Sequence, residues 1–353
     1  MKTKPTTSSA ITIGIDPGVR KHAVCILDAK GRVIQIETIA NTRAALTALS
    51  RRHRRALVVM EVGTQSPWIS RLFESLGHRV LVANPRKVRA IYQNERKSDR
   101  RDCEMLARIA RADETLLHPV KHGSEEMQRD MLQIKLRDNL VRRRVDLISS
   151  VRFTLKSLGV RLPSPHTESF AKYARRLLEA EHPDLLGLVD PMLRVIEEIT
   201  AQIRVLEGAI DEMAATKYPE VELLTQIKGV GTITSLAFLL TVGDPTRFNR
   251  RRDVAAFFGL VPKRDQSGDT DKQMRISKCG DAYVRKLLVS AAQYILGPHG
   301  PDTDLRRHGL KLAERGGPRA KKKAVVAVAR KLAVLLLAIW YDESIYEPGR
   351  LAA

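Results

Sequence analysis

The sequence has few cysteines, few aromatic residues and a deficit of acids. Its three cysteines, Cys25, Cys103 and Cys279, form no CxxC pair, and no histidine stands at ligand spacing from them. This excludes a disulfide framework and a cysteine-based zinc site, and it indicates a reducing compartment. With 61 Lys and Arg against 40 Asp and Glu, the formal net charge is +21. We therefore expect a polyanionic partner, foremost nucleic acid.

Long hydrophobic runs are also scarce. The stretch MKTKPTTSSA at residues 1–10 lacks the apolar core of a signal peptide. The most apolar late run, residues 332–341, is shorter than a bilayer span and follows Arg330 and Lys331. The sequence thus predicts no membrane association. We expect a cytoplasmic protein of bacterial type, associated with the nucleoid.

The pattern of short apolar runs changes along the chain. Residues 1–120 alternate β-rich runs with helical stretches, which predicts an α/β domain. Residues 121–217 form long, charged, helical segments and predict a coiled-coil arm. Residues 218–353 predict an all-α domain. In the first domain, strands are expected at residues 11–15, 22–27, 32–40, 56–60 and 79–82, and helices at residues 42–53, 66–76 and about 99–112.

Four acids stand at positions that could bring them together. Asp16 follows the first predicted strand and Glu61 the fourth, whereas Asp99 and Asp102 share one face of a helix. Each alone has an ordinary explanation, such as a turn residue, a cap or a solvated ion pair. Together they suit one or two Mg²⁺ ions, which prefer carboxylate oxygens and activate phosphate chemistry. Acids at strand ends and on a late helix are typical of an RNase H-like fold.

The stretch LLTQIKGVGTITSLAFLL, residues 223–240, has the pattern of a helix-hairpin-helix. It predicts a helix that ends at Lys228, a turn at Gly229 and Gly231, and a second helix from Thr232. Such a turn lets the backbone approach a phosphate without reading the base sequence. A plain helical turn is the alternative.

A polar segment at residues 262–281 contains two serines, Ser267 and Ser277, in what we expect to be an irregular loop. A serine attacks a phosphodiester only when another group accepts its proton and the phosphorane charge is stabilised. No histidine lies nearby in the sequence, and spacing alone does not make either serine catalytic. The cations expected to meet a nucleic acid here are Arg275, Lys278, Arg285 and Lys286.

The motifs GIDPG, NERKSDRRDCEMLARI, IKGVGTITSLAFL, FGLVPKRDQSG and RISKCGDAYVRKLLVSAA occur in this order. The chain resembles the DEDD transposases of insertion sequences, which include Piv-type DNA invertases and bridge-RNA-guided recombinases. The resemblance implies a RuvC-like RNase H-fold domain in which Asp16, Glu61, Asp99 and Asp102 bind Mg²⁺. It also implies that Ser267 forms a phosphoserine link to DNA.

The resemblance further implies partners. Family members form dimers or tetramers through the helical arm, with acids and serine from different protomers in one active site. Some bind an RNA that pairs with donor and target DNA. Gln266 stands where many members have a small residue, which leaves Ser277 as a competing nucleophile.

The residues alone are also compatible with two other functions. One is a RuvC-like nuclease that resolves Holliday junctions with metal-activated water, in which Ser267 is only a loop residue. The other is a non-enzymatic nucleic-acid-binding protein whose acids balance charge.

Overall fold

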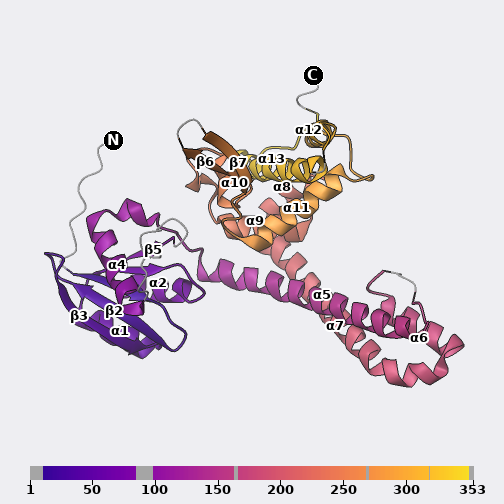
Figure 1. Ribbon diagram of the computed structural model, residues 1–353, viewed down its shortest axis with the longest axis horizontal. Coiled ribbons are helices and arrows are strands. Elements are labelled where there is room, and N and C mark those ends of the chain that lie inside the picture. Colours follow the sequence, from indigo (N-terminus) through magenta and orange to yellow (C-terminus); the bar gives the residue numbers. More distant parts are fainter. Residues whose placement is uncertain (1–10, 85–97, 163–165, 268–269, 318, 350–353) are drawn as a thin grey trace. The chain divides into compact units, whose positions relative to one another are not determined.

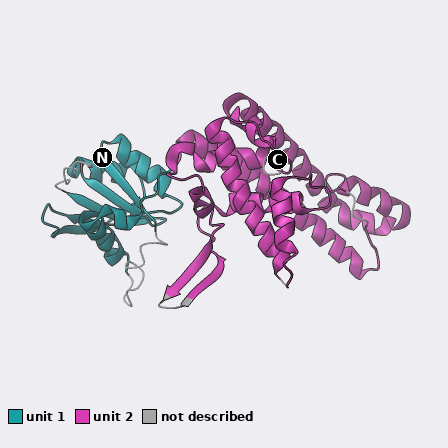
Figure 2. Ribbon diagram, turned by 90° about the horizontal axis from the view of Figure 1, so that it is seen from above, with its two compact units in different colours: residues 1–122 teal, residues 123–353 magenta. Residues whose placement is uncertain are grey.

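The computed structural model describes residues 11–84, 98–162, 166–267, 270–317 and 319–349. It divides the chain into two compact units, residues 1–122 and 123–353 (Figure 2). The predicted arm and the predicted C-terminal domain both fall within the second unit. Their separation at residues 217 and 218 stays a prediction.

The first unit contains a five-stranded sheet with strand order β3-β2-β1-β4-β5. Strands β1, β2 and β3 form an antiparallel meander, and β4 runs parallel to both β1 and β5. This confirms the expected mixed α/β class of the unit. Its elements are β1 Thr12–Asp16, β2 Lys21–Leu27, β3 Val33–Ala40, α1 Arg43–Arg52, β4 Leu57–Glu61, α2 Ser66–Ser75, β5 Arg79–Ala83, α4 Asp99–Ala112 and the 3₁₀ turn η1 Glu114–Leu117.

Helices cover both faces of this sheet (Figure 1). Ile13 and Ile15 of β1 pack in one core with apolar residues of α1 and α2. The opposite face is covered by α4, where Cys103 and Ala107 pack against Cys25 of β2. Because successive strand residues point to opposite faces, a strand that is covered on both sides must be apolar throughout. This explains the uninterrupted runs TIGI and LVVM.

The second unit begins with two long helices that pack against each other, α5 Glu125–Ser157 and α7 Pro183–Lys217. The shorter α6 Phe170–Glu181 packs on α7 at the tip of the arm. A separate apolar core holds the tip together, with Ile148 of α5, Phe170 of α6 and Ile196 of α7 fully or almost fully buried. The helical character predicted for this region is confirmed, whereas a coiled-coil geometry stays a prediction.

The base of the arm is part of the C-terminal core. Met131 and Ile134 of α5 and Ile210 and Met213 of α7 belong to the same buried cluster as the helices that follow. Those following elements are α8 Glu220–Thr225, α9 Thr232–Val242, η2 Pro245–Arg247, α10 Asp253–Phe257, β6 Pro262–Ser267, β7 Thr270–Ile276, α11 Ala282–Leu296, α12 Asp304–Ala313 and α13 Ala320–Asp342.

Helix α13 is the longest of the helices that follow the arm. Its 23 residues exceed the apolar run recognised in the sequence, and among the described residues it alone is long and apolar enough to cross a membrane. Half of that apolar window is buried inside the unit, including Val328, Leu332 and Leu336. Core helices of soluble proteins have the same length and burial, so this feature is weak support for a membrane span.

Candidate active site

Two of the four predicted acids lie at the ends of neighbouring parallel strands. Asp16 is the last residue of β1 and Glu61 the last residue of β4, and both are half-buried. The preceding residues, Ile15 and Met60, pair in register. Because parallel neighbours end at the same edge of a sheet, the two acids stand next to each other there.

The other two acids lie in the first turn of α4, where Asp99 is exposed and Asp102 is only 9% exposed. The helix rests directly on β1, since a Cβ on Gly14 would lie 2.0 Å from the Cys103 carbonyl oxygen. Burial raises the pKa of Cys103 to about 12, and the nearby charge of Asp16 contributes to the rise. The first turn of α4 therefore lies close to the edge at which β1 ends.

The carboxylates at this edge have the donor chemistry that Mg²⁺ prefers. Among the described residues, however, no three His, Cys, Asp or Glu side chains are grouped closely enough to hold a metal ion. Residues 85–97, which precede α4, lie outside the described residues. The acids thus fit a divalent ion chemically, while the metal site they are predicted to form stays a prediction.

A histidine that the sequence analysis missed supports the loop after Glu61. His122 Nε2 lies 2.9 Å from Ser66 Oγ, which in turn accepts a hydrogen bond from the backbone N–H of Gly63 at 3.0 Å. Burial lowers the pKa of His122, and the charge of Arg71 lowers it further. No signal in the sequence links His122 to Ser66, because the two are 56 residues apart.

The polar segment expected to be an irregular loop is a β-hairpin, so that expectation was wrong, and residues 218–353 are mostly helical rather than all-α. Strands β6 and β7 pair antiparallel, and Ser267, the last residue of β6, pairs with Thr270 of β7. Residues 268–269, which connect them, lie outside the described residues. The structure therefore places the predicted nucleophile at the far end of a two-stranded ribbon.

The base of the hairpin is tied to the chain before it. A Cβ on Gly280 would lie 1.9 Å from the Phe257 carbonyl oxygen, and this glycine has a φ of +68°. Arg285 Nη1 donates to the carbonyl oxygens of Phe258 at 3.0 Å and Cys279 at 2.7 Å. Arg285, predicted to bind nucleic acid, thus has a structural role, and its contact with nucleic acid stays a prediction.

The competing serine lies at this base. The backbone N–H of Ser277 donates to the Val261 carbonyl oxygen at 2.8 Å, and Ser277 Oγ accepts from the Cys279 N–H at 3.4 Å. Its side chain is half-buried. The two candidate nucleophiles thus occupy opposite ends of the same hairpin.

The glycine turn differs from the predicted one in two respects. Helix α8 ends at Thr225 rather than at Lys228. Gly229 has a φ of +96°, and a Cβ there would lie 2.7 Å from the ring of Tyr294 in α11, so this glycine accommodates a protein neighbour. Gly231 has open space beside its Cα and precedes α9. It is the position in the turn that a phosphate could approach.

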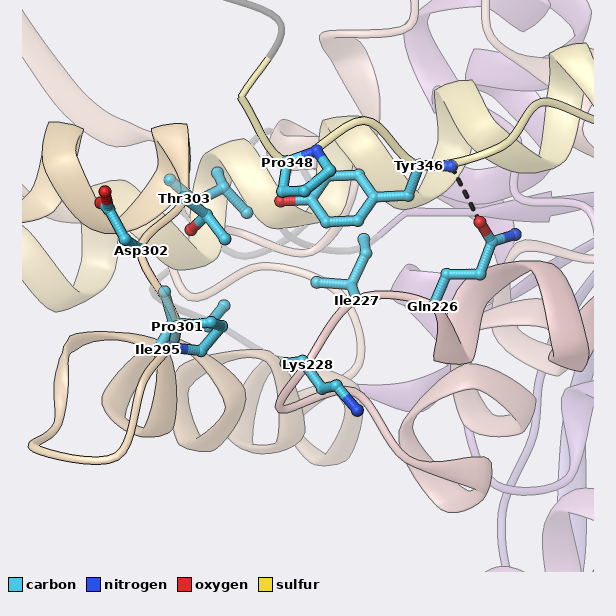
Figure 3. A pocket seen from close by; sticks show the side chains of 10 residues that line it. Gln226, Ile227, Lys228, Ile295, Pro301, Asp302, Thr303, Tyr346 and Pro348 are labelled. Atoms are coloured by element: carbon cyan, nitrogen blue, oxygen red, sulfur yellow. Dashed lines mark hydrogen bonds between the residues drawn. The ribbon is translucent and has the colours of Figure 1, made fainter. Parts of the chain in front are cut away.

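Helix α9 begins at Thr232 as expected. Whether the turn forms a true helix-hairpin-helix stays a prediction. Beside it lies a pocket of about 430 Å³, with the ring of Tyr346 above Ile227 (Figure 3). The Tyr346 N–H donates to Gln226 Oε1 at 2.9 Å and so ties the C-terminal segment to the turn. Lys228 lies at the rim of this mostly apolar pocket (Figure 3).

The remaining predicted nucleic-acid-binding cations are exposed. Arg275 lies on β7, and Lys278 follows it with a φ of +52°. Lys286 Nζ contacts Asp138 Oδ1 of α5 at 2.7 Å and lies over the ring of Tyr283. Their contacts with nucleic acid stay predictions.

Two family models match the chain. The model of the IS110-type DEDD transposases matches residues 13–159, and that of the IS116/IS110/IS902 transposase family matches residues 221–305. Together they contain all four acids and both serines. The chain belongs to the DEDD transposases of the IS110 type. It is a DNA transposase, and its family uses divalent metal ions.

Relatives of this DEDD transposase span nearly its whole length. A transposase for insertion sequence element IS1111A of Coxiella burnetii is 29% identical over 96% of the chain and 91% of that protein. A probable family 20 transposase of Pseudomonas aeruginosa is 27% identical over 87% and 90%. A pilin gene-inverting protein of Moraxella bovis is 22% identical over 82% and 83%.

Proposed function

We propose that the chain is the transposase of an insertion sequence, cutting and rejoining DNA strands through a phosphoserine at Ser267. The residues that would hold Mg²⁺ are Asp16, Glu61, Asp99 and Asp102. The observation that carries this proposal is the acid edge, with two acids at adjacent strand ends and two in the first turn of the helix packed on β1. The match to a DEDD family over residues 13–159 supports it.

The proposed active site combines the serine of one copy of the chain with the acids of another. Ser267 Oγ forms a bond to the scissile phosphorus, and one bridging oxygen of the DNA leaves as a hydroxyl. The serine proton passes to a carboxylate of the acid set, which returns a proton to the departing oxygen of the DNA. When bound, Mg²⁺ neutralises charge on the phosphate and favours the attacking oxygen. Rejoining reverses these steps, with a hydroxyl of the other DNA strand attacking the phosphoserine.

Phosphate contacts provide most of the proposed DNA affinity. The net charge of +21 and the exposed Lys228, Arg275 and Lys278 support this. Arg285 and Lys286 add to the DNA affinity in addition to their contacts within the protein. The backbone N–H groups near Gly231 and Thr232 face the phosphates of the DNA. Such binding weakens steeply as salt rises.

The proposed partners are donor DNA, target DNA, a bridge RNA and further copies of the chain, in the bacterial cytoplasm at the nucleoid. The arm exposes large apolar side chains, with Phe153 80% and Leu188 76% exposed, which supports a homodimer or homotetramer. The RNA is tested by sequencing the nucleic acid that copurifies with the protein. A discrete RNA from beside the gene supports guidance, and heterogeneous host RNA contradicts it.

The nucleophile is tested by trapping covalent protein–DNA adducts with Ser267→Ala and, as a matched control from the same hairpin, Ser277→Ala. We expect Ser267→Ala to abolish the adducts while DNA binding stays normal, and Ser277→Ala to retain them. If adducts persist in Ser267→Ala and vanish in Ser277→Ala, the nucleophile is Ser277 and not Ser267. Cleavage with free ends and no adduct in the wild type would instead favour a nuclease that uses water.

A further inference from the structure

We propose that Asn41 and Gln65 are positioning residues that join the loop after Asp16 to the loop after Glu61 and so set the spacing of these two acids. This inference rests on the proposed metal-binding role of the acids. Neither residue carries a charge, and neither was singled out by the sequence.

Asn41, directly after β3, holds the loop that follows Asp16. Its backbone N–H donates to the Arg20 carbonyl oxygen at 3.0 Å. Its side-chain Nδ2 donates to the carbonyl oxygens of Val19 at 2.9 Å and Gly18 at 3.4 Å. One asparagine thus contacts three successive residues of the turn between β1 and β2.

Gln65 connects this loop to the other acid. It stands four residues after Glu61 and immediately before α2. Its Oε1 accepts a hydrogen bond from Asn41 Nδ2, and its Nε2 donates to the Gly18 carbonyl oxygen at 3.3 Å. The two amides therefore form a bridge that spans the ends of two neighbouring strands.

The bridge links two loops that are otherwise tightly held. A Cβ on Gly18 would lie 2.3 Å from the Lys21 carbonyl oxygen, so the first loop is a close turn. On the far side, Ser66 and His122 hold Gly63 of the second loop. A shift of either amide would therefore move a loop as a whole, together with the acid at its start.

The bridge also contacts a buried histidine. Burial lowers the pKa of the fully buried His22, and a side-chain hydrogen bond with Asn41 raises it. A buried polar group destabilises a fold unless it is hydrogen-bonded. Asn41 therefore satisfies a buried imidazole as well as holding the loop after Asp16.

Groups that orient metal ligands typically change metal affinity about 10- to 100-fold when removed. The test measures Mn²⁺ binding to the full chain by electron paramagnetic resonance, with Asn41→Ala compared with Gln35→Ala. Gln35 is a matched control because it is an exposed amide on β3. We expect the Kd for Mn²⁺ to rise about tenfold in Asn41→Ala only, and its DNA cleavage to recover as Mg²⁺ is raised.

Gln65→Ala provides a second variant if Asn41→Ala folds poorly, and we expect a similar rise in Kd. In the double variant the two effects should be less than additive, because both residues act through one bridge. Mn²⁺ affinity in Gln65→Ala equal to that of the control would overturn the inference, as would a loss of cleavage that excess Mg²⁺ does not restore.

The variant Asp16→Asn distinguishes an error in the proposed bridge from an error in the proposed metal site. If Asp16→Asn loses Mn²⁺ and the amide variants keep it, the acids bind metal and only the bridge is wrong. If Asp16→Asn also binds Mn²⁺ like the wild type, both the metal site and the inference fail.

Discussion

The acid edge of the first unit and the serine hairpin of the second are built in opposite ways. The strands that carry Asp16 and Glu61 are buried on both faces, with Ile13 and Val58 fully buried on one face and Val59 on the other. On the hairpin, residues 263–266 and 271–275 are all exposed. The acids proposed to bind metal are thus held by a hydrophobic core. The proposed nucleophile is held only by the pairing of two exposed strands.

The hairpin has few interactions that hold its shape. Within the described residues, its strands pair only with each other, and the ion pair between Arg264 and Asp271 joins them. An isolated two-stranded hairpin is marginally stable, and exposed ion pairs add little. A bound DNA can therefore reposition the serine at low cost, whereas the acids stay where the sheet and α4 place them.

The largest expected effect comes from the acid edge. Asp102→Asn removes a charge from the buried start of α4, and we expect strand cleavage in Mg²⁺ to fall by about two to three orders of magnitude. Asp113→Asn, at the other end of the same helix, is the control and should cleave normally. Cleavage is measured on labelled element ends. Full cleavage activity in Asp102→Asn would contradict the proposal that Asp102 binds the metal ion.

Two glycines, one beside the acid edge and one at the base of the hairpin, make equivalent close contacts with backbone oxygens. Added Cβ atoms would lie 2.0 Å from a backbone oxygen at Gly14 and 1.9 Å at Gly280. Gly14→Ala pushes α4 away from β1, and we expect a loss of about 3 kcal/mol in stability together with the loss of Mn²⁺ binding. Gly280→Ala should cost about 3–5 kcal/mol, because its φ of +68° adds backbone strain to the same overlap, and it should reduce adducts while Mn²⁺ binding stays normal.

Gly63→Ala is the control for both, because a Cβ there meets nothing within 4 Å. Stability is measured by denaturant unfolding and metal binding by titration. If Gly280→Ala lowered Mn²⁺ affinity as strongly as Gly14→Ala, the two sites would not be built independently.

The smallest expected effect concerns pH. Burial lowers the pKa of His122, so its neutral form is favoured in the folded state. The stability it contributes is present above its unfolded pKa of about 6.5 and is lost as the pH falls through the lower folded value. His122→Gln should reduce the drop in melting temperature between pH 7.5 and 5.5. The exposed His118→Gln should leave that drop unchanged, and an unchanged drop in His122→Gln would contradict this account.

The elements around the acids could be predicted because their signals are local. Runs such as ITIGI and ALVVM end at Asp16 and Glu61, and turn residues separate them, so strand ends and acids were found together. What could not be predicted is the contact of α4 with Gly14, or the link between Asn41 and Gln65. Both depend on residues far apart in the sequence that meet only after the sheet forms.

The hairpin was missed for a different reason. The strands of β6 and β7 are short and charged, and lack the apolar alternation that marks a half-buried strand. The end of α8 was misplaced because apolar Ile227 continues the helical pattern past Thr225. The role of Arg285 was missed because no sequence signal shows that two carbonyl groups will accept from it.

The shared core at the base of the arm has a mechanical consequence. Helix α5 runs without interruption from the tip cluster around Ile148 to the C-terminal cluster around Ile134, with no hinge between them. A force applied at the tip is therefore transmitted as torque to the packing of α9 and α11, next to the glycine turn and the base of the hairpin. The arm therefore behaves as a rigid body, so a partner bound at its tip sets the orientation of its base.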